Sequence, residues 1–214
     1  MKVAFLLLVL HSAFTGLTDD EAYYWVLSQH PAWGYAYHPP AMAWMIALFG
    51  KTLGWISQAY AFRCLLVRLP ALFSGLVCLC LMSRWSSRVF SISERKTSLW
   101  IFSFAGVFSL CWMMVPDVPL LLGWSALFWI GWKIIYTDYI KEGHSSWDSV
   151  GLVLSTLLVM LSKFSGVLAV LSTAISFMVF LPKTKWPKYV AQLSLGFIIA
   201  LLPILYWNST HDWT

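Results

Sequence analysis

Three carboxylates stand side by side near the start of the chain. The stretch TDDEAYYW holds Asp19, Asp20 and Glu21, a third of the nine acidic residues, and aromatic rings follow at once. A carboxylate within about 3 Å of a hydroxyl group takes its proton as a general base. Neighbouring acids of this kind are therefore candidates for acid–base chemistry. The plainer interpretation, which we favour for Asp19 alone, is a solvated loop.

Cationic side chains follow at intervals. His38 precedes two prolines, and Lys163 lies between two apolar runs. Arg63 and Arg68 lie at the entrance to another apolar segment. Such groups could neutralise a phosphate, which arginine binds bidentately. Each also has a simpler role, because a histidine serves in turns, arginines snorkel to lipid phosphate, and a lysine is favourable at a helix C-terminus.

The composition is that of a membrane protein. The 214 residues are 60% hydrophobic and only 11% charged, with a mean hydropathy of +0.74. A soluble domain is about 25% charged. Fourteen tryptophans suit the aromatic belts of a membrane protein. The four cysteines show no CxxC spacing and indicate apolar packing rather than a disulfide or metal framework. The net charge of +5 is typical of cytoplasmic loops and gives no reason to expect a nucleic-acid partner.

The elements that must position these side chains are apolar helices. A helix needs about 20 mostly apolar residues to cross a bilayer. The region 41–60, which holds Lys51 and two glycines, predicts one or two short interfacial helices instead. Turns are predicted at Pro39-Pro40, Pro70, Pro116, Pro119, Pro182 and Pro187. Seven segments are predicted to span: 1–17, 69–90, 97–115, 118–136, 149–163, 164–181 and 189–207.

Lysine and arginine predict the orientation, because cytoplasmic loops carry an excess of both. With the N-terminus in the cytoplasm, four cations lie outside: Lys51, Arg63, Arg68 and Lys163. The other ten lie inside: Lys2, Arg84, Arg88, Arg95, Lys96, Lys133, Lys141, Lys183, Lys185 and Lys188. The acidic stretch, Asp117 and the tail then face outward. Residues 1–17 also resemble a cleaved signal peptide, although we favour a retained span.

Six patches in order carry a resemblance to a known family: DDEAYYW, GYAYHPPAMAWMIALFG, VRLPAL, PDVPLLLGW, LSKFSGVLAV and LYWNSTHDW. Together they resemble family 39 glycosyltransferases, which use polyprenyl-phosphate sugars. That group includes protein mannosyltransferases and bacterial lipid A aminoarabinose transferases. The resemblance implies an all-α polytopic membrane protein with about seven transmembrane helices, the N-terminal half of a GT-C fold. It also implies an integral protein of the bacterial inner membrane with a cytoplasmic N-terminus.

The resemblance assigns roles to individual residues. The family's acidic pair maps onto Asp20 and Glu21, with Asp19 as an alternative, and its second outer acid maps onto Asp117. The position before its double proline is His38. One family arginine, three residues beyond the first acid, is replaced here by Tyr23. Residues 1–214 are expected to form one transmembrane domain, cut short at the C-terminus relative to the family, with 18–62 as the outer catalytic loop.

The expected reaction moves a sugar, with inversion, from a polyprenyl phosphate to a lipid, glycan or protein acceptor. Asp20 is the candidate base, which would take the proton of the attacking hydroxyl group. Cations would stabilise the departing phosphate: His38, Arg63, Arg68 and Lys163. No cofactor is expected, and a divalent metal stays open. The alternatives are an inactive or accessory membrane protein, and a transporter or flippase, whose span centres would carry charge.

Overall fold

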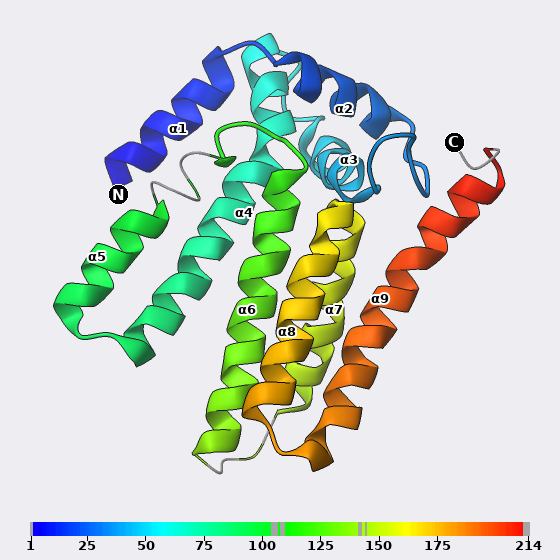
Figure 1. Ribbon diagram of the computed structural model, residues 1–214. Coiled ribbons are helices and arrows are strands. Elements are labelled where there is room, and N and C mark those ends of the chain that lie inside the picture. Colours follow the sequence, from blue (N-terminus) through cyan, green and yellow to red (C-terminus); the bar gives the residue numbers. More distant parts are fainter. Residues whose placement is uncertain (1, 104–106, 108–109, 141–142, 144, 212–214) are drawn as a thin grey trace. The chain divides into compact units, whose positions relative to one another are not determined.

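Helices account for nearly all of the computed structural model in Figure 1, which describes residues 2–103, 107, 110–140, 143 and 145–211. No strand occurs among these residues. Lys141, one of the cations that set the predicted orientation, lies outside the described residues. The chain divides into two compact units, one of residues 1–32 and 40–119 and the other of residues 33–39 and 120–214.

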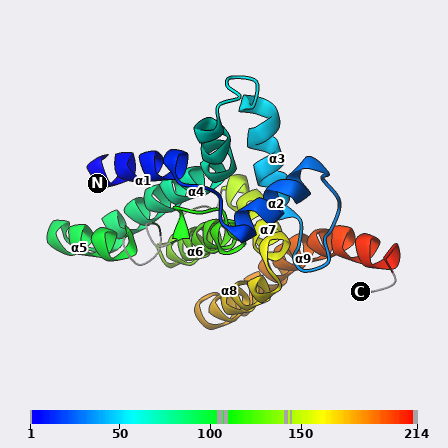
Figure 2. The same cartoon turned by 90° about the horizontal axis from the view of Figure 1, so that it is seen from above.

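The first unit is built around one long helix. α1 and α3 both pack on α4, α2 packs on α3, and α5 folds back along α4 (Figures 1 and 2). Its helices are α1 (Lys2–Phe14), α2 (Asp19–Gln29), α3 (Ala41–Leu53), α4 (Tyr60–Val89) and α5 (Ile92–Phe102). The stretch from residue 18 to 62, predicted as an outer loop with short helices, therefore contains α2, α3 and the start of α4.

The second unit is a bundle in which α6 to α9 run side by side (Figure 1). Its helices are α6 (Asp117–Tyr139, whose first residues belong to the other unit), α7 (Ser146–Ser162), η2 (Phe164–Gly166), α8 (Val167–Phe180), η3 (Lys183–Lys185) and α9 (Trp186–Ser209). Small residues let these helices approach closely. A Cβ atom on Gly123 would lie 2.5 Å from Cγ2 of Val159, and one on Gly196 would lie 2.6 Å from the carbonyl oxygen of Val153.

Among the described residues, three helical stretches are long and apolar enough to cross a membrane: Tyr60–Val89, Asp117–Tyr139 and Lys183–Ser209. They correspond to the predicted spans 69–90, 118–136 and 189–207. The predicted spans 149–163 and 164–181 fall on shorter apolar helices, Ser146–Ser162 and Phe164–Phe180. The predicted span 1–17 contains α1, of 13 residues.

The predicted span 97–115 is helical over part of its length. α5 ends at Phe102, residues 103, 107 and 110 are also helical, and residues 111–113 form a turn. The helix begins earlier than predicted because Ser91 and Glu94 form a capping box, with the Ser91 amide donating to Glu94 Oε2 over 2.9 Å. The apolar window that suggested a span therefore begins inside an 11-residue helix.

Pro70 lies inside a helix, where a turn was predicted. α4 begins at Tyr60 and continues through Pro70 to Val89. Proline removes one helical hydrogen bond, because it has no amide to donate to the carbonyl oxygen of Leu66 four residues earlier. The Ser74 hydroxyl adds a separate hydrogen bond to the Pro70 carbonyl oxygen, over 2.7 Å. Arg68 consequently lies in the body of a helix and not at its entrance.

Candidate functional site

α2 begins with a reciprocal pair of hydrogen bonds. The Glu21 amide donates to the Thr18 hydroxyl over 3.3 Å, and the Thr18 amide donates to Glu21 Oε2 over 3.0 Å. This capping box satisfies two backbone donors at a helix N-terminus. It also places Asp19 and Asp20 in the first helical turn, where the helix dipole favours negative charge. The clustering of acids thus has a structural cause, whatever chemistry they perform.

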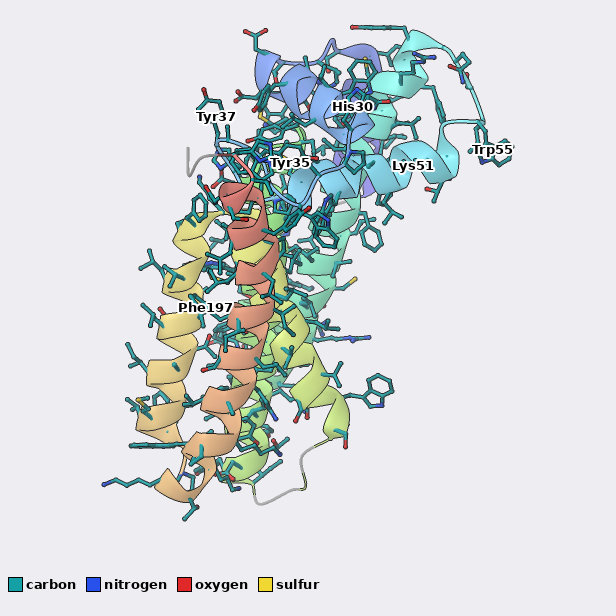
Figure 3. The ribbon with its side chains drawn as sticks, turned by 90° about the vertical axis from the view of Figure 1, so that its right-hand side faces the viewer. His30, Tyr35, Tyr37, Lys51, Trp55 and Phe197 are labelled. Carbon is teal, nitrogen blue, oxygen red and sulfur yellow. The ribbon has the colours of Figure 1, made fainter. Side chains whose placement is uncertain are left out.

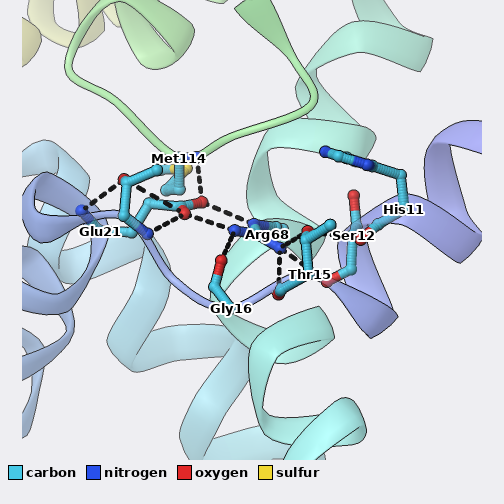
Figure 4. Close-up of polar contacts among 8 residues, drawn as sticks. His11, Ser12, Thr15, Gly16, Glu21, Arg68 and Met114 are labelled. Atoms are coloured by element: carbon cyan, nitrogen blue, oxygen red, sulfur yellow. Dashed lines mark hydrogen bonds and ion pairs between the residues drawn. The ribbon is translucent and has the colours of Figure 1, made fainter.

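Glu21 does not stay at the surface. Its carboxylate forms a bidentate ion pair with Arg68, with Nε–Oε1 at 2.7 Å and Nη2–Oε2 at 2.6 Å (Figure 4). The Glu21 side chain is fully buried and that of Arg68 is 1% exposed. A charge without water needs both a partner and further hydrogen bonds. The surrounding backbone supplies them.

The remaining donors of Arg68 close the end of α1. Nη1 donates to the carbonyl oxygens of Ser12 and Thr15 and to the Thr15 hydroxyl, and Nη2 donates to the carbonyl oxygen of Gly16 (Figure 4). These groups include carbonyls that a helix C-terminus leaves without helical partners. Every nitrogen of the guanidinium therefore donates to the protein. We assign Arg68 a structural role, because no donor is left for a phosphate.

Glu21 also holds a distant segment. The backbone amide of Met114 donates to its Oε1 over 3.0 Å. Burial alone would raise the pKa of Glu21, but hydrogen bonds from Arg68, Thr18 and Met114 outweigh burial and lower it. The carboxylate is thus held in its charged form. One buried acid joins the start of α2, the end of α1, the body of α4 and the segment before α6.

Two further acids belong to segments that Glu21 holds. Asp20 directly precedes Glu21 in α2, and Asp117 follows Met114, whose amide donates to Glu21, by three residues. Asp20 is exposed and Asp117 is partly exposed at the start of α6. The nearby phenol of Tyr24 is buried, and its pKa is raised first by burial and then by negative charge on Tyr23, Asp20 and Asp117.

The predicted cations are distributed over both units. Arg63 is exposed and donates to Gln58 within the first unit. In the second unit, His38 lines a cavity of about 160 Å³ together with Phe164. Lys163 immediately precedes Phe164 and occupies the C-cap position of α7. The structure thus pairs Glu21 with Arg68, holds the segments of Asp20 and Asp117 through Glu21, and places His38 and Lys163 in the second unit.

Several participants were not predicted, although the sequence contained one signal for them. The letters TDDE fit the capping-box pattern of Ser or Thr followed three residues later by Glu, which predicts that Glu21 turns back toward Thr18. Nothing local in the sequence indicates that Arg68 meets Glu21, or that the Met114 amide joins them. Across the described residues, no group of three His, Cys, Asp or Glu side chains could hold a metal ion.

Comparison with known proteins returns no relative. The chain matches no protein-family model, no curated protein and no solved structure. Its function must therefore be argued from the site itself.

Proposed function

We propose that the chain is a membrane glycosyltransferase that moves a sugar from a polyprenyl phosphate to an acceptor at the outer face of the bacterial inner membrane. The observation that supports this most directly is that Glu21 joins the segments that carry Asp20 and Asp117, through its capping box with Thr18 and its hydrogen bond from the Met114 amide. The two acids are 97 positions apart in sequence, and the buried contacts of Glu21 fix the backbone beside both.

The proposed step is a displacement with inversion at the anomeric carbon of the sugar. The acceptor hydroxyl oxygen forms the new bond to this carbon, and the bond from the carbon to the phosphate oxygen breaks. The phosphate leaves with the bonding electron pair, and the hydroxyl proton passes to Asp20 as general base. Asp117 supplies a second carboxylate, which could accept the proton or orient the hydroxyl. Glu21 is excluded as the general base, because both of its carboxylate oxygens are buried and already accept hydrogen bonds.

The charge that develops on the leaving phosphate needs nearby cations. Arg63 is the candidate in the unit that carries Asp20, and Arg68 is excluded because its donors are all engaged. The proposal includes the seven spans, a cytoplasmic N-terminus and an outward-facing α2. Three helices of sufficient length and apolarity are its structural support. The acceptor is a lipid, glycan or protein, and no nucleic acid takes part.

The proposal is tested by following the donor. Purified protein in detergent is incubated with polyprenyl phosphates that carry radiolabelled hexose or aminopentose, and the released polyprenyl phosphate is separated and quantified. We expect release from at least one donor, dependent on the amount of protein. Absence of release from every donor, with both lipid A and peptide acceptors present, would argue against a transferase.

A further inference from the structure

The first unit contains a cavity of about 300 Å³, which lies among α2, α3 and the start of α4. This is the lower end of the usual range for small-molecule sites, about 300–1,000 Å³. Ile46, Ala47, Leu66 and Val67 form its apolar part. None of the acids near Tyr24 lines it.

Two cations line this cavity without a compensating acid. Lys51 reaches it from the end of α3, and Arg63 from the first turn of α4. Within the described ranges, neither forms an ion pair with a carboxylate. Uncompensated cations at a partly apolar cavity raise the local concentration of anions. The two positive charges of Lys51 and Arg63 match a doubly negative phosphate group better than a singly negative carboxylate.

The wall that carries Arg63 is held in place. The Gln58 side chain donates to the carbonyl oxygen of Gly54 over 3.1 Å, and its own oxygen accepts a hydrogen bond from Arg63. A guanidinium fixed in this way loses less entropy when it binds a ligand. Beside it, Gly50 leaves space, since a Cβ atom there would meet nothing within 4 Å.

Large apolar side chains stand exposed beside the cavity. Trp55 is 79% exposed, Tyr60 69% and Ile56 53%. Trp55 and Ile56 belong to the turn between α3 and α4, next to Gly54 and Gln58 of the cavity wall, and Tyr60 is the first residue of α4. Figure 3 shows Lys51 on α3 and Trp55 in this turn. Tryptophan and tyrosine favour the boundary between lipid head groups and hydrocarbon. A ligand at this cavity would therefore have lipid beside it.

We infer that this cavity binds the phosphate head group of a membrane lipid, with Lys51 and Arg63 contacting the phosphate and the turn at Trp55 contacting the hydrocarbon. The lipid could be a constituent of the bilayer or a lipid-borne substrate, since the recognised chemistry is the same. The inference shares Arg63 with the proposed function but does not depend on it, because binding at this cavity requires no transfer reaction.

The test is lipid binding to the purified full chain in neutral detergent, measured by native mass spectrometry. The probes are phosphatidate, phosphatidylcholine and polyprenyl phosphate, with glycerol 3-phosphate as the soluble phosphate. We expect both phosphomonoester lipids to bind, and phosphatidylcholine to bind at least about tenfold more weakly, since charge-assisted hydrogen bonds favour the doubly charged group. In the double variant Lys51→Met/Arg63→Met, their affinity should fall at least about tenfold.

Two further variants keep the result interpretable. Arg84→Met/Arg88→Met removes the same charge from exposed positions on α4 outside the cavity, and should bind as the wild type does. Gly50→Leu fills the open space without changing charge, and should weaken binding like the double variant. Unchanged affinity in Gly50→Leu and in the double variant would overturn the inference. Equal affinity for glycerol 3-phosphate would overturn its lipid part, and binding of polyprenyl phosphate but not phosphatidate would identify the source as a substrate lipid.

Discussion

Glu21 and Arg68 form a buried bidentate ion pair although 47 residues separate them in sequence. The pair is surrounded by backbone groups from the end of α1 and from the segment that precedes α6. A buried ion pair satisfied in this way fixes geometry more than it adds stability, since its desolvation offsets much of its attraction. We regard it as the element that positions the exposed acids Asp20 and Asp117.

Removing one partner of this pair should destabilise the protein strongly. Arg68→Met leaves Glu21 as an uncompensated buried charge and should lower the free energy of unfolding by about 3–5 kcal/mol. Denaturant titration in detergent, followed by circular dichroism, measures the change. Arg63→Met is the matched control, because Arg63 is an exposed arginine on the same helix, and a loss within about 0.5 kcal/mol is expected. An equal loss of unfolding free energy in the two variants would mean that the ion pair contributes no more to stability than an exposed arginine does.

Acid should loosen the same contacts. The pKa of Glu21 is lower in the folded chain than its ordinary value, so its contribution is present above the unfolded pKa of about 4.3 and is lost as the pH falls through the folded value. We expect Glu21→Gln to be less stable than the wild type at pH 7, with the difference shrinking below about pH 4. Thermal unfolding in detergent across this range measures it. A difference independent of pH would contradict the ionised pair.

Close packing in the second unit predicts a contrast between two glycines of α6. Gly123→Ala would push a methyl group to 2.5 Å from Cγ2 of Val159 and 3.0 Å from its backbone nitrogen. We expect a loss of about 1–3 kcal/mol from overpacking. Gly131→Ala would meet Cγ2 of Thr173 at 3.4 Å, an ordinary contact, and should be neutral or slightly stabilising because alanine favours helix. The two midpoints of thermal unfolding should differ, and identical values would speak against this packing.

The orientation can be tested by labelling single cysteines in a cysteine-free background. Residues 19 and 92 are both exposed at the ends of helices, and the bias of lysine and arginine places them on opposite sides of the membrane. A membrane-impermeant maleimide added from outside should modify Asp19→Cys but not Ile92→Cys. A detergent-permeabilised sample, in which both should react, is the control. The reverse pattern of labelling would invert the topology.

Sequence reasoning predicted what depends on composition and local pattern. The long helices were predicted from apolar segments such as the one inside Tyr60–Val89, because a run of about 20 apolar residues is enough to indicate a membrane-spanning helix. The helix of Ala41–Leu53 was predicted as a short helix, because Lys51 and two glycines interrupt the apolar region 41–60. Helix ends were less accurate, because they depend on capping by single residues. Ser91 starts a helix that an averaged window cannot resolve, and α4 continues through Pro70, where a turn was predicted.

The site was predictable only in part, for a related reason. The TDDE stretch gave Asp20 and Glu21 as one acidic pair. Their residue types do not show that Asp20 is exposed while Glu21 is buried against Arg68, 47 positions away. Arg68 was predicted as an anchor or phosphate ligand, since an arginine beside an apolar segment usually lies at an interface. The Met114 amide carries no sequence signal, because every residue type except proline offers the same donor.

The central claim is that Asp20, and not its neighbour, is the base of a sugar transfer. The measurement is the rate of polyprenyl phosphate release for Asp20→Asn and Asp19→Asn, each with its membrane level determined. Both changes remove one exposed carboxylate from the first turn of α2, so the effects on helix stability match. We expect Asp20→Asn to slow release by about 100-fold or more, as loss of a general base does, and Asp19→Asn to stay within a few-fold of the wild type. Equal rates for the wild type and Asp20→Asn would contradict the account and transfer the role of base to Asp117.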